Sequence, residues 1–295
     1  MQLIPPPGLA TPAASTGSAQ RVLIVLALLA PFVFYFGTLQ SIVALWDSSE
    51  TFAHGYVVAP ISLWLVWRKR DVLRTVPLEP YWPALVLVAL AGLGWLVATF
   101  GEVQVLRQYA LVAMFPLAVL ALCGRRFAGA LAFPLLFLLF AVPFGEVFVA
   151  PLIDLTADFT VAALQMTGIP VLRNGTTFEI PSGHWSVVEA CSGLRYLISS
   201  ITLGCLYAYL SYRAWWRRAL FIGLSIVVPI VANWLRAYMI VMIGHLSNMR
   251  LATGVDHVVY GWLFFGVVMF LMFWIGRLWQ EDEVEAAPAV ADASP

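Results

Sequence analysis

Long apolar runs are the feature of this sequence that most restricts its fold. Several runs of about 18 or more residues hold few charges, and each is long enough to cross a hydrocarbon core of about 30 Å. Only 11% of the 295 residues are charged, whereas a soluble domain has about 25%. The runs do not alternate polar and apolar residues as the strands of a membrane β-barrel do. We therefore predict an all-α polytopic membrane protein.

The predicted membrane domain covers residues 22–277 and contains about eight spans. Residues 1–21 are rich in Pro, Ala, Ser, Thr and Gly and lack the basic start of a secretory signal, so we expect a disordered cytoplasmic tail. Residues 278–295 are acidic and then rich in Ala and Pro, which predicts a second loose tail. The approximate limits of the spans are 22–45, 54–67, 83–100, 106–123, 127–145, 191–211, 219–245 and 257–277.

Positive charges orient the predicted domain. Cytoplasmic connections of membrane proteins are enriched in Lys and Arg, and here every second connection is basic. The opposite connections 46–53, 101–105, 146–190 and 246–256 together hold only Arg173 and Arg250. We therefore expect both termini in the cytoplasm. The basic residues that set this orientation are Arg68, Lys69, Arg70, Arg74, Arg125, Arg126, Arg213, Arg217, Arg218 and Arg277.

The longest extracytoplasmic connection, 146–190, has two predicted parts. Residues 150–168 place apolar side chains at helical spacing with Asp154 and Asp158 on another face, which favours an interfacial helix lying on the membrane. Residues 171–188 alternate and contain Asn-Gly and Pro-Ser-Gly turn signals. A short β-hairpin or an extended loop fits them.

Three polar residues lie at or inside predicted membrane spans, where a membrane protein has few polar side chains. Cys191 is at the predicted extracytoplasmic start of the sixth span, and His257 is at that of the eighth. Arg236 lies in the seventh span, roughly 14 Å below its outer end at 1.5 Å per residue. A guanidinium on a long side chain can reach toward the interface. We therefore expect all three side chains to meet near the outer membrane surface.

These residue types suffice for acyl transfer through a thioester. The thiolate is the attacking form of cysteine, and a helix N-terminus stabilises it. A neighbouring histidine can take the thiol proton, and an arginine can stabilise the thiolate or an oxyanion. Burying an arginine at a membrane centre costs about 2.5–3.5 kcal/mol, so Arg236 calls for a partner or a function. A structural ion pair of Arg236 with Glu189 or Asp256 is the main alternative.

Three further residues are candidates for support. Arg195 follows Cys191 by four residues and would lie one helical turn deeper on the same face. Asn233 precedes Arg236 by three residues on one face and could orient it. Glu189 could pair with either arginine. The three cysteines, Cys123, Cys191 and Cys205, are an odd number, and two of them are inside apolar runs, which does not favour disulfides.

Three motifs together resemble the exosortase family. They are Glu189-Ala190-Cys191-Ser192-Gly193-Leu194-Arg195, then Asn233-Trp234-Leu235-Arg236, then His257-Val258-Val259-Tyr260-Gly261-Trp262. The resemblance covers roughly residues 22–277. It implies a cysteine transpeptidase of the bacterial inner membrane, with Cys191 as nucleophile, His257 as general acid and base, and Arg236 stabilising charge.

The resemblance also implies the partners. Substrates would be exported proteins with a C-terminal signal made of a Pro-Glu-Pro motif, a transmembrane helix and a basic tail. The enzyme would cleave near the motif and transfer the protein to an unidentified acceptor, with a glycolipid or a polysaccharide as the candidates, in a process linked to exopolysaccharide. The scissile peptide would lie just outside the bilayer, on the periplasmic face, and the loop 146–190 would form a lid or a binding edge.

Other classes of function remain open from the residues alone. A transporter would line its pathway with buried Arg and His. Its sequence would also be expected to show internal repeats and polar groups at the membrane midplane, whereas no repeat is evident here and the polar cluster lies toward one face. A membrane acyltransferase would use the same thiol with a lipid donor, and a non-catalytic assembly subunit would use none of these groups. No basic block favours nucleic acid, and we expect no cofactor and no metal.

Overall fold

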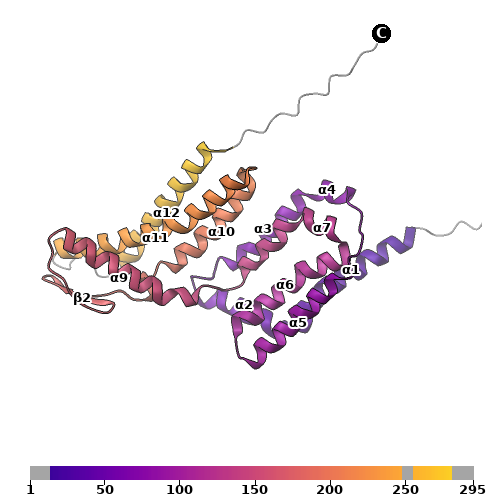
Figure 1. Ribbon diagram of the computed structural model, residues 1–295, viewed down its shortest axis with the longest axis horizontal. Helices are drawn as coiled ribbons and strands as arrows, with labels where there is room; N and C mark the ends of the chain where they lie inside the picture. Colours follow the sequence, from indigo (N-terminus) through magenta and orange to yellow (C-terminus); the bar gives the residue numbers. More distant parts are fainter. Residues whose placement is uncertain (1–13, 248–254, 281–295) are drawn as a thin grey trace, which may run out of the picture. The chain divides into compact units, whose positions relative to one another are not determined.

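The structure is a computed structural model that describes residues 14–247 and 255–280, with side chains for residues 20–247 and 261–280. The chain divides into two compact units, Met1–Phe144 and Gly145–Pro295. Helices dominate both units, and the described strands form one small sheet in the second (Figure 1). The mostly helical fold that the apolar runs predict is therefore confirmed.

The first unit is built around α6, which packs against α5, α1 and α2. Short connections and the tight turn around Gly101 make α5 and α6 neighbours in a helical hairpin. The helices of this unit are α1 (Ala14–Phe34), α2 (Phe36–Ser48), α3 (Gly55–Arg68), α4 (Arg70–Thr75), α5 (Ala84–Phe100), α6 (Gln104–Cys123), α7 (Arg125–Ala130) and α8 (Ala132–Phe137), followed by a 3-10 turn (Leu138–Ala141).

Two of the predicted spans in this unit are broken. The span predicted at 22–45 bends by 71° where α1 meets α2 at Tyr35. The span predicted at 127–145 divides into α7, α8 and the 3-10 turn. Pro134 has no N–H for the carbonyl of Ala130, four residues earlier, and the Nζ of Lys69 donates to that carbonyl instead. The break is therefore stabilised by a charged donor.

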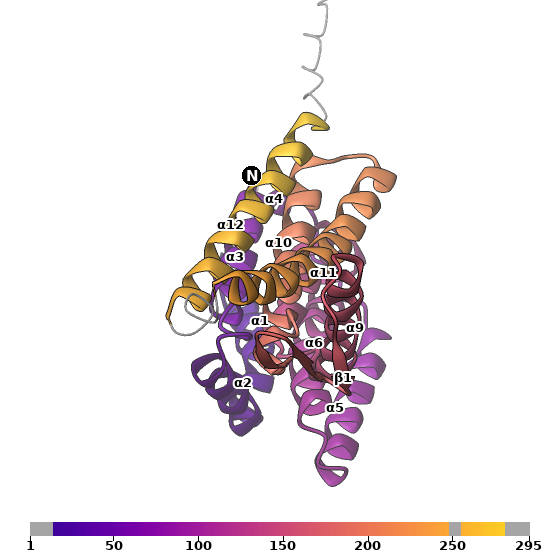
Figure 2. The same ribbon diagram turned by 90° about the vertical axis from the view of Figure 1, so that its left-hand side faces the viewer.

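The second unit is organised by α11, which packs against α10, α9 and α12 (Figures 1 and 2). At about 48 Å, α11 is longer than the hydrocarbon core requires. The elements of this unit are a 3-10 turn (Glu146–Phe148), α9 (Val149–Met166), β1 (Leu172–Asn174), β2 (Thr177–Ile180), β3 (Gly183–Ser186), a 3-10 turn (Glu189–Cys191), α10 (Leu194–Ser211), α11 (Trp215–Leu246) and α12 (Val255–Leu278).

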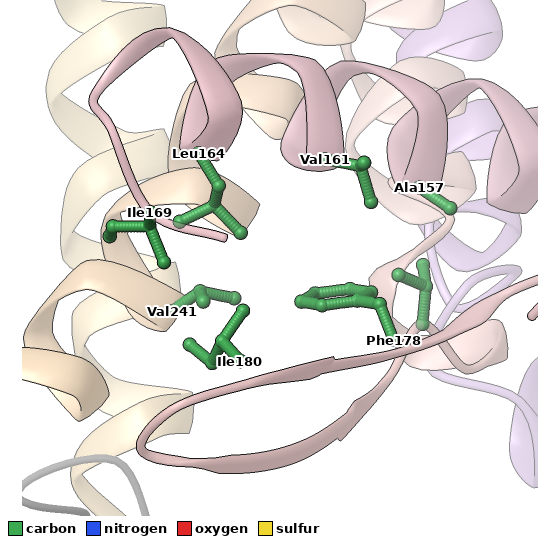
Figure 3. Close-up of a cluster of buried hydrophobic side chains, with 8 residues drawn as sticks. Ala157, Val161, Leu164, Ile169, Phe178, Ile180 and Val241 are labelled. Carbon is green, nitrogen blue, oxygen red and sulfur yellow. The ribbon is translucent and has the colours of Figure 1, made fainter. Parts of the chain in front are cut away.

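The three strands form an antiparallel sheet in the order β1-β2-β3. Of the two alternatives predicted for residues 171–188, a short β-hairpin or an extended loop, the structure has the strands, in a sheet of three rather than two. Phe178 and Ile180 alternate with exposed residues along β2, so one face of the sheet is buried. Figure 3 shows these two side chains pointing toward Val161 and Leu164 of α9 and Val241 of α11. This apolar cluster attaches the sheet to both helices.

Close contacts of small residues hold α10, α11 and α12 together. Gly204 of α10 lies so near Ser225 of α11 that an added Cβ would be 1.9 Å from its Oγ. A Cβ at Gly276 of α12 would lie 2.5 Å from the ring of Phe221. Tyr212 donates a 2.7 Å hydrogen bond to the carbonyl of Gly276. Such small-residue contacts are typical of helices that pack within membranes.

Length and apolarity identify four helices able to cross a membrane, or five if α1 and α2 form one bent span, among the described residues. The protein is therefore a multi-pass membrane protein, but the predicted eight spans are not confirmed. The segment Glu146–Met166, which includes α9, is one of the four by length and composition, although its sequence predicts an interfacial helix. At 14 and 17 residues, α3 and α5 are shorter than a typical span.

The two predicted tails fall mostly outside the described residues, which omit 1–13 and 281–295. Helix α1 begins at Ala14, inside the segment 1–21 predicted as a tail.

Candidate active site

Cys191 ends a 3-10 turn that joins the sheet to α10. Its N–H donates to the carbonyl of Val188 at 2.8 Å, and Ser192 N–H donates to Glu189 at 2.9 Å. Helix α10 begins only at Leu194, after Gly193 in a left-handed conformation with φ of 77°. The prediction that Cys191 starts the helix is therefore wrong, because the left-handed glycine ends the turn and sets a new chain direction. The thiol precedes the helix and is partly buried.

Asn233 of α11 connects this turn to two helices. Its Nδ2 donates a 2.8 Å hydrogen bond to the carbonyl of Cys191 and lies 3.4 Å from the Oγ1 of Thr156 in α9. Its Oδ1 accepts a 3.1 Å hydrogen bond from Nη1 of Arg236. Asn233 is only 4% exposed, so these bonds are shielded from water. The structure thus joins Cys191, Asn233 and Arg236 in one hydrogen-bonded chain.

Arg236 is buried, with 8% of its surface exposed. Its guanidinium carbon lies 5.3 Å from the ring centre of Tyr196 in α10, within the range of a cation–π interaction. Its Nε is buried and has no hydrogen-bond partner among the described residues. A buried donor left unpaired costs about 1–3 kcal/mol, and more when charged. Among the described residues, the arginine therefore keeps one N–H donor without a partner, while its Nη1 is held by Asn233.

Two glycines allow this close packing. A Cβ at Gly193 would lie 2.5 Å from Cγ of Asn233, so only glycine fits against the amide. A Cβ at Gly261 of α12 would lie 3.0 Å from Nε of Arg236 and 3.3 Å from the hydroxyl of Tyr196. The missing side chain at Gly261 therefore lets α12 approach Arg236 and Tyr196 closely.

His257 occupies the first turn of α12, and its side chain lies outside the described residues. Position 257 precedes Gly261 by four residues, which puts both positions on one face of the helix. That face is the one that meets Arg236 at Gly261. The convergence of His257 with Arg236 and Cys191 stays a prediction, because it depends on a side chain outside the described residues.

The supporting residues have different outcomes. Asn233 accepts a hydrogen bond from Arg236, which is compatible with the predicted orienting role. Arg195 is in the first turn of α10 and partly buried, but the expected one-turn spacing from Cys191 fails because Cys191 is outside the helix. Glu189 is exposed in the 3-10 turn, and within the described chain no ion pair joins it to Arg236.

The depth of the site also differs from the prediction. Arg236 was expected to reach outward to a thiol near the end of its helix. Instead the turn of Cys191 lies level with Asn233, about 20 Å along α11 from its end at Leu246. The last turns of α11 pack against α9 and the sheet, as Val241 shows. The turn of Cys191 therefore lies close to Asn233 and Arg236, and the arginine side chain does not have to extend toward the end of α11.

Several site residues could not be found from the sequence. Thr156, Gly193, Tyr196 and Gly261 contribute through contacts across different helices. Gly193 and Gly261 fall inside the motifs, but nothing in a single sequence separates a packing glycine from any other. No group of three or more His, Cys, Asp and Glu able to hold a metal occurs among the described residues.

Fold and site together define a multi-pass helical membrane protein with a free thiol linked through an asparagine to a buried arginine. The chain belongs to the transmembrane exosortase family (Exosortase_EpsH), which it matches over residues 46–274. The resemblance carried by the three motifs is thus confirmed. No curated protein and no solved structure matches the chain. Members of this family are cysteine transpeptidases, and membership implies a membrane enzyme that processes proteins with Pro-Glu-Pro C-terminal signals.

Proposed function

We propose that this protein cleaves C-terminal sorting signals of tail-anchored exported proteins through a thioester on Cys191. The observation that carries the proposal is the hydrogen-bonded chain from the carbonyl of Cys191 through Asn233 to Arg236. It links the turn that carries a partly buried free thiol to a buried cation within the described residues. This arrangement is suited to an acyl-transfer reaction in which negative charge develops next to the thiol.

The reaction has two balanced steps. The Sγ of Cys191 attacks the scissile carbonyl, and its proton passes through His257 to the leaving amine as the C–N bond breaks. The acyl part stays on Cys191 as a thioester, and the membrane-anchored part is released as an amine. An acceptor nucleophile, either a hydroxyl or amine of a glycolipid or polysaccharide, or water, then attacks the thioester and returns the proton to the thiol. Arg236 donates to the oxyanion of both tetrahedral intermediates.

The unpaired Nε of Arg236 supports its role. A preorganised donor is most useful where charge appears only in the transition state. The ground state leaves this N–H without a described partner, while Nη1 is held by Asn233 and the guanidinium carbon lies 5.3 Å from the ring centre of Tyr196. An oxyanion would supply the missing acceptor.

The positions of the charges support an extracytoplasmic site. Cys191 lies before the first residue of α10, and Arg213, Arg217 and Arg218 lie after its last. The 18 residues of α10 span about 27 Å, close to the thickness of the hydrocarbon core. With the basic residues in the cytoplasm, the thiol belongs to the periplasmic side of the inner membrane.

The test compares Cys191→Ser with Cys205→Ser. Both cysteines are free and partly buried, and Cys205 lies inside α10. Purified full-length protein in liposomes would be given a reporter that carries a Pro-Glu-Pro motif, a transmembrane helix and a basic tail. We expect Cys191→Ser to stop processing and Cys205→Ser to keep it near the wild-type rate. Normal processing by Cys191→Ser would falsify the nucleophile, absence of processing by the wild-type protein would favour a transporter or an assembly subunit, and acylation by lipid without peptide cleavage would favour an acyltransferase.

A further inference from the structure

A cavity of about 350 Å³ opens beside Cys191 in the second unit. Cys191 forms part of its wall, and the segment Ser186–Val188 leads from β3 along the cavity to the turn of the nucleophile. Ligand pockets measure about 300–1,000 Å³, so this volume suits one or two residues of a peptide rather than a whole lipid. The rest of the wall is formed by Thr160, Phe178, Trp185, Ala237, Ile240 and Val241.

The residues that line the cavity carry no charged side chain. Thr160 is polar, but its hydroxyl already donates a 2.7 Å hydrogen bond to the carbonyl of Thr156. A carboxylate or ammonium group placed here would lose much of its hydration without gaining a charged partner, which costs several kcal/mol. An apolar side chain would instead gain about 25 cal/mol for each Å² removed from water.

Trp185 contributes a donor to this apolar wall. Its indole Nε1 is buried and has no hydrogen-bond partner among the described residues. Buried tryptophan N–H groups usually find an acceptor. Trp185 is paired with Phe178 across β2 and β3, and Phe178 belongs to the apolar cluster of Figure 3, so the sheet sets the position of the indole. A backbone carbonyl of an extended peptide beside β3 would satisfy the N–H.

We propose that this cavity is the specificity pocket for a substrate residue that flanks the scissile bond, and that it accepts an uncharged apolar side chain. Trp185 donates from Nε1 to a backbone carbonyl of the same substrate segment. The occupant is a peptide because the cavity adjoins both the thiol and the end of an edge strand, where extended peptides add to sheets. This assignment of the pocket depends on the proposed function of Cys191. The pocket excludes acidic side chains at the substrate position that it binds.

The test changes the size of the pocket and measures substrate preference. Reporters with Ala, Val, Phe or Asp at each residue flanking the cleavage site would compete in pairs for the full-length protein in liposomes. Ile240→Ala enlarges the pocket, and we expect the Phe-to-Val product ratio to rise about 5- to 10-fold at one flanking position. Ala237→Leu fills the pocket, and we expect the Ala-to-Val ratio to rise there. Every variant should process the Asp reporter at least about 100-fold more slowly than the Val reporter.

Ile243→Ala is the matched control for Ile240→Ala. Both residues are isoleucines of α11, but Ile243 is 41% exposed and does not line the cavity. We expect this control to keep the wild-type preference. Trp185→Phe removes the donor and also enlarges the cavity, so processing of every reporter should fall about 5- to 10-fold and the Phe-to-Val ratio should rise at the same flanking position.

The outcomes separate the pocket from the nucleophile. If Ile240→Ala and Ala237→Leu both keep the wild-type preference while Cys191→Ser is inactive, the pocket is placed wrongly and the proposed function stands. Efficient processing of the Asp reporters at both positions would also overturn the pocket. If Cys191→Ser stays active, the proposed function itself fails.

Discussion

The side-chain amide of Asn233 donates a 2.8 Å hydrogen bond to the backbone carbonyl of Cys191 while it accepts one of 3.1 Å from Arg236. One buried side chain thus sets both the position of the turn before α10 and the orientation of the guanidinium. The carbonyl and the guanidinium face opposite ends of the same amide, so neither can move far without breaking the other contact. Asn233 is a positioning residue in this account.

Replacing Asn233 should slow the chemical step more than it weakens substrate binding. Asn233→Ala leaves the carbonyl of Cys191 and Nη1 of Arg236 unpaired. Hydrogen bonds to charged groups contribute about 1.5–3 kcal/mol, which corresponds to roughly a 10- to 100-fold loss in kcat. KM should change little because Asn233 is not part of the cavity wall. Steady-state kinetics of both constants on the tail-anchored reporter test this, and a raised KM with unchanged kcat would argue against a positioning role.

Gly193→Ala should disable the site for two reasons that a control can separate. Its φ of 77° is strained for alanine, and the added Cβ would lie 2.5 Å from Cγ of Asn233. Gly168 has a similar φ of 82° but nothing within 4 Å of an added Cβ. We expect Gly193→Ala to lower processing by more than about tenfold and Gly168→Ala to keep it within about twofold, apart from about 1 kcal/mol of strain. Equal effects of the two variants would mean that the contact with Asn233 has no role.

Tyr196 should matter for its ring and not for its hydroxyl. Its ring centre lies 5.3 Å from the guanidinium carbon of Arg236. Tyr196→Leu should lower kcat about 3- to 10-fold, because a desolvated cation–π contact contributes roughly 1–2 kcal/mol. Tyr196→Phe keeps the ring and should stay within about twofold of wild type. If the phenylalanine variant is as slow as the leucine variant, the hydroxyl is the functional group.

Truncating Phe178 should weaken the packing of the sheet against α9 and α11. Its ring is 4% exposed in the apolar cluster that attaches β2 to α9 and α11. Removing a buried phenylalanine side chain costs about 3–5 kcal/mol, so Phe178→Ala should speed tryptic cleavage after Arg173 in β1. Met166→Ala is the control, because that side chain is 88% exposed. Unchanged cleavage in Phe178→Ala would show that the sheet is held by other contacts.

The sequence predicts elements better than it predicts their breaks. Apolar runs identify most of the helices, and turn residues identify the sheet. The eight-span count is not reproduced because the run 127–145 is broken near Pro134 and because α3, α5 and α10 do not reach the length and apolarity of a membrane span. Hydropathy averages over a window, whereas a single missing N–H or a local bend ends a helix.

The candidate site was predicted by residue type and corrected in its geometry. The bond between Asn233 and Arg236 follows the helical spacing of their motif, whereas the bond from Asn233 to the carbonyl of Cys191 was not predicted. The start of α10 was misplaced because Gly193 adopts a left-handed conformation that glycine permits but does not require. The cavity and the contacts of Tyr196 and Thr156 depend on packing between distant segments, which no local pattern encodes.

The most direct test of the central claim is to trap the acyl-enzyme on Cys191. The purified protein would be mixed with the tail-anchored reporter, quenched in acid and digested for peptide mass spectrometry, with hydroxylamine treatment of a parallel sample. We predict an adduct of the reporter's N-terminal part on Cys191 that hydroxylamine removes, with Cys123 and Cys205 unmodified. An adduct on either of those cysteines, or cleavage of the reporter with no hydroxylamine-sensitive adduct under any quench time, would contradict the account.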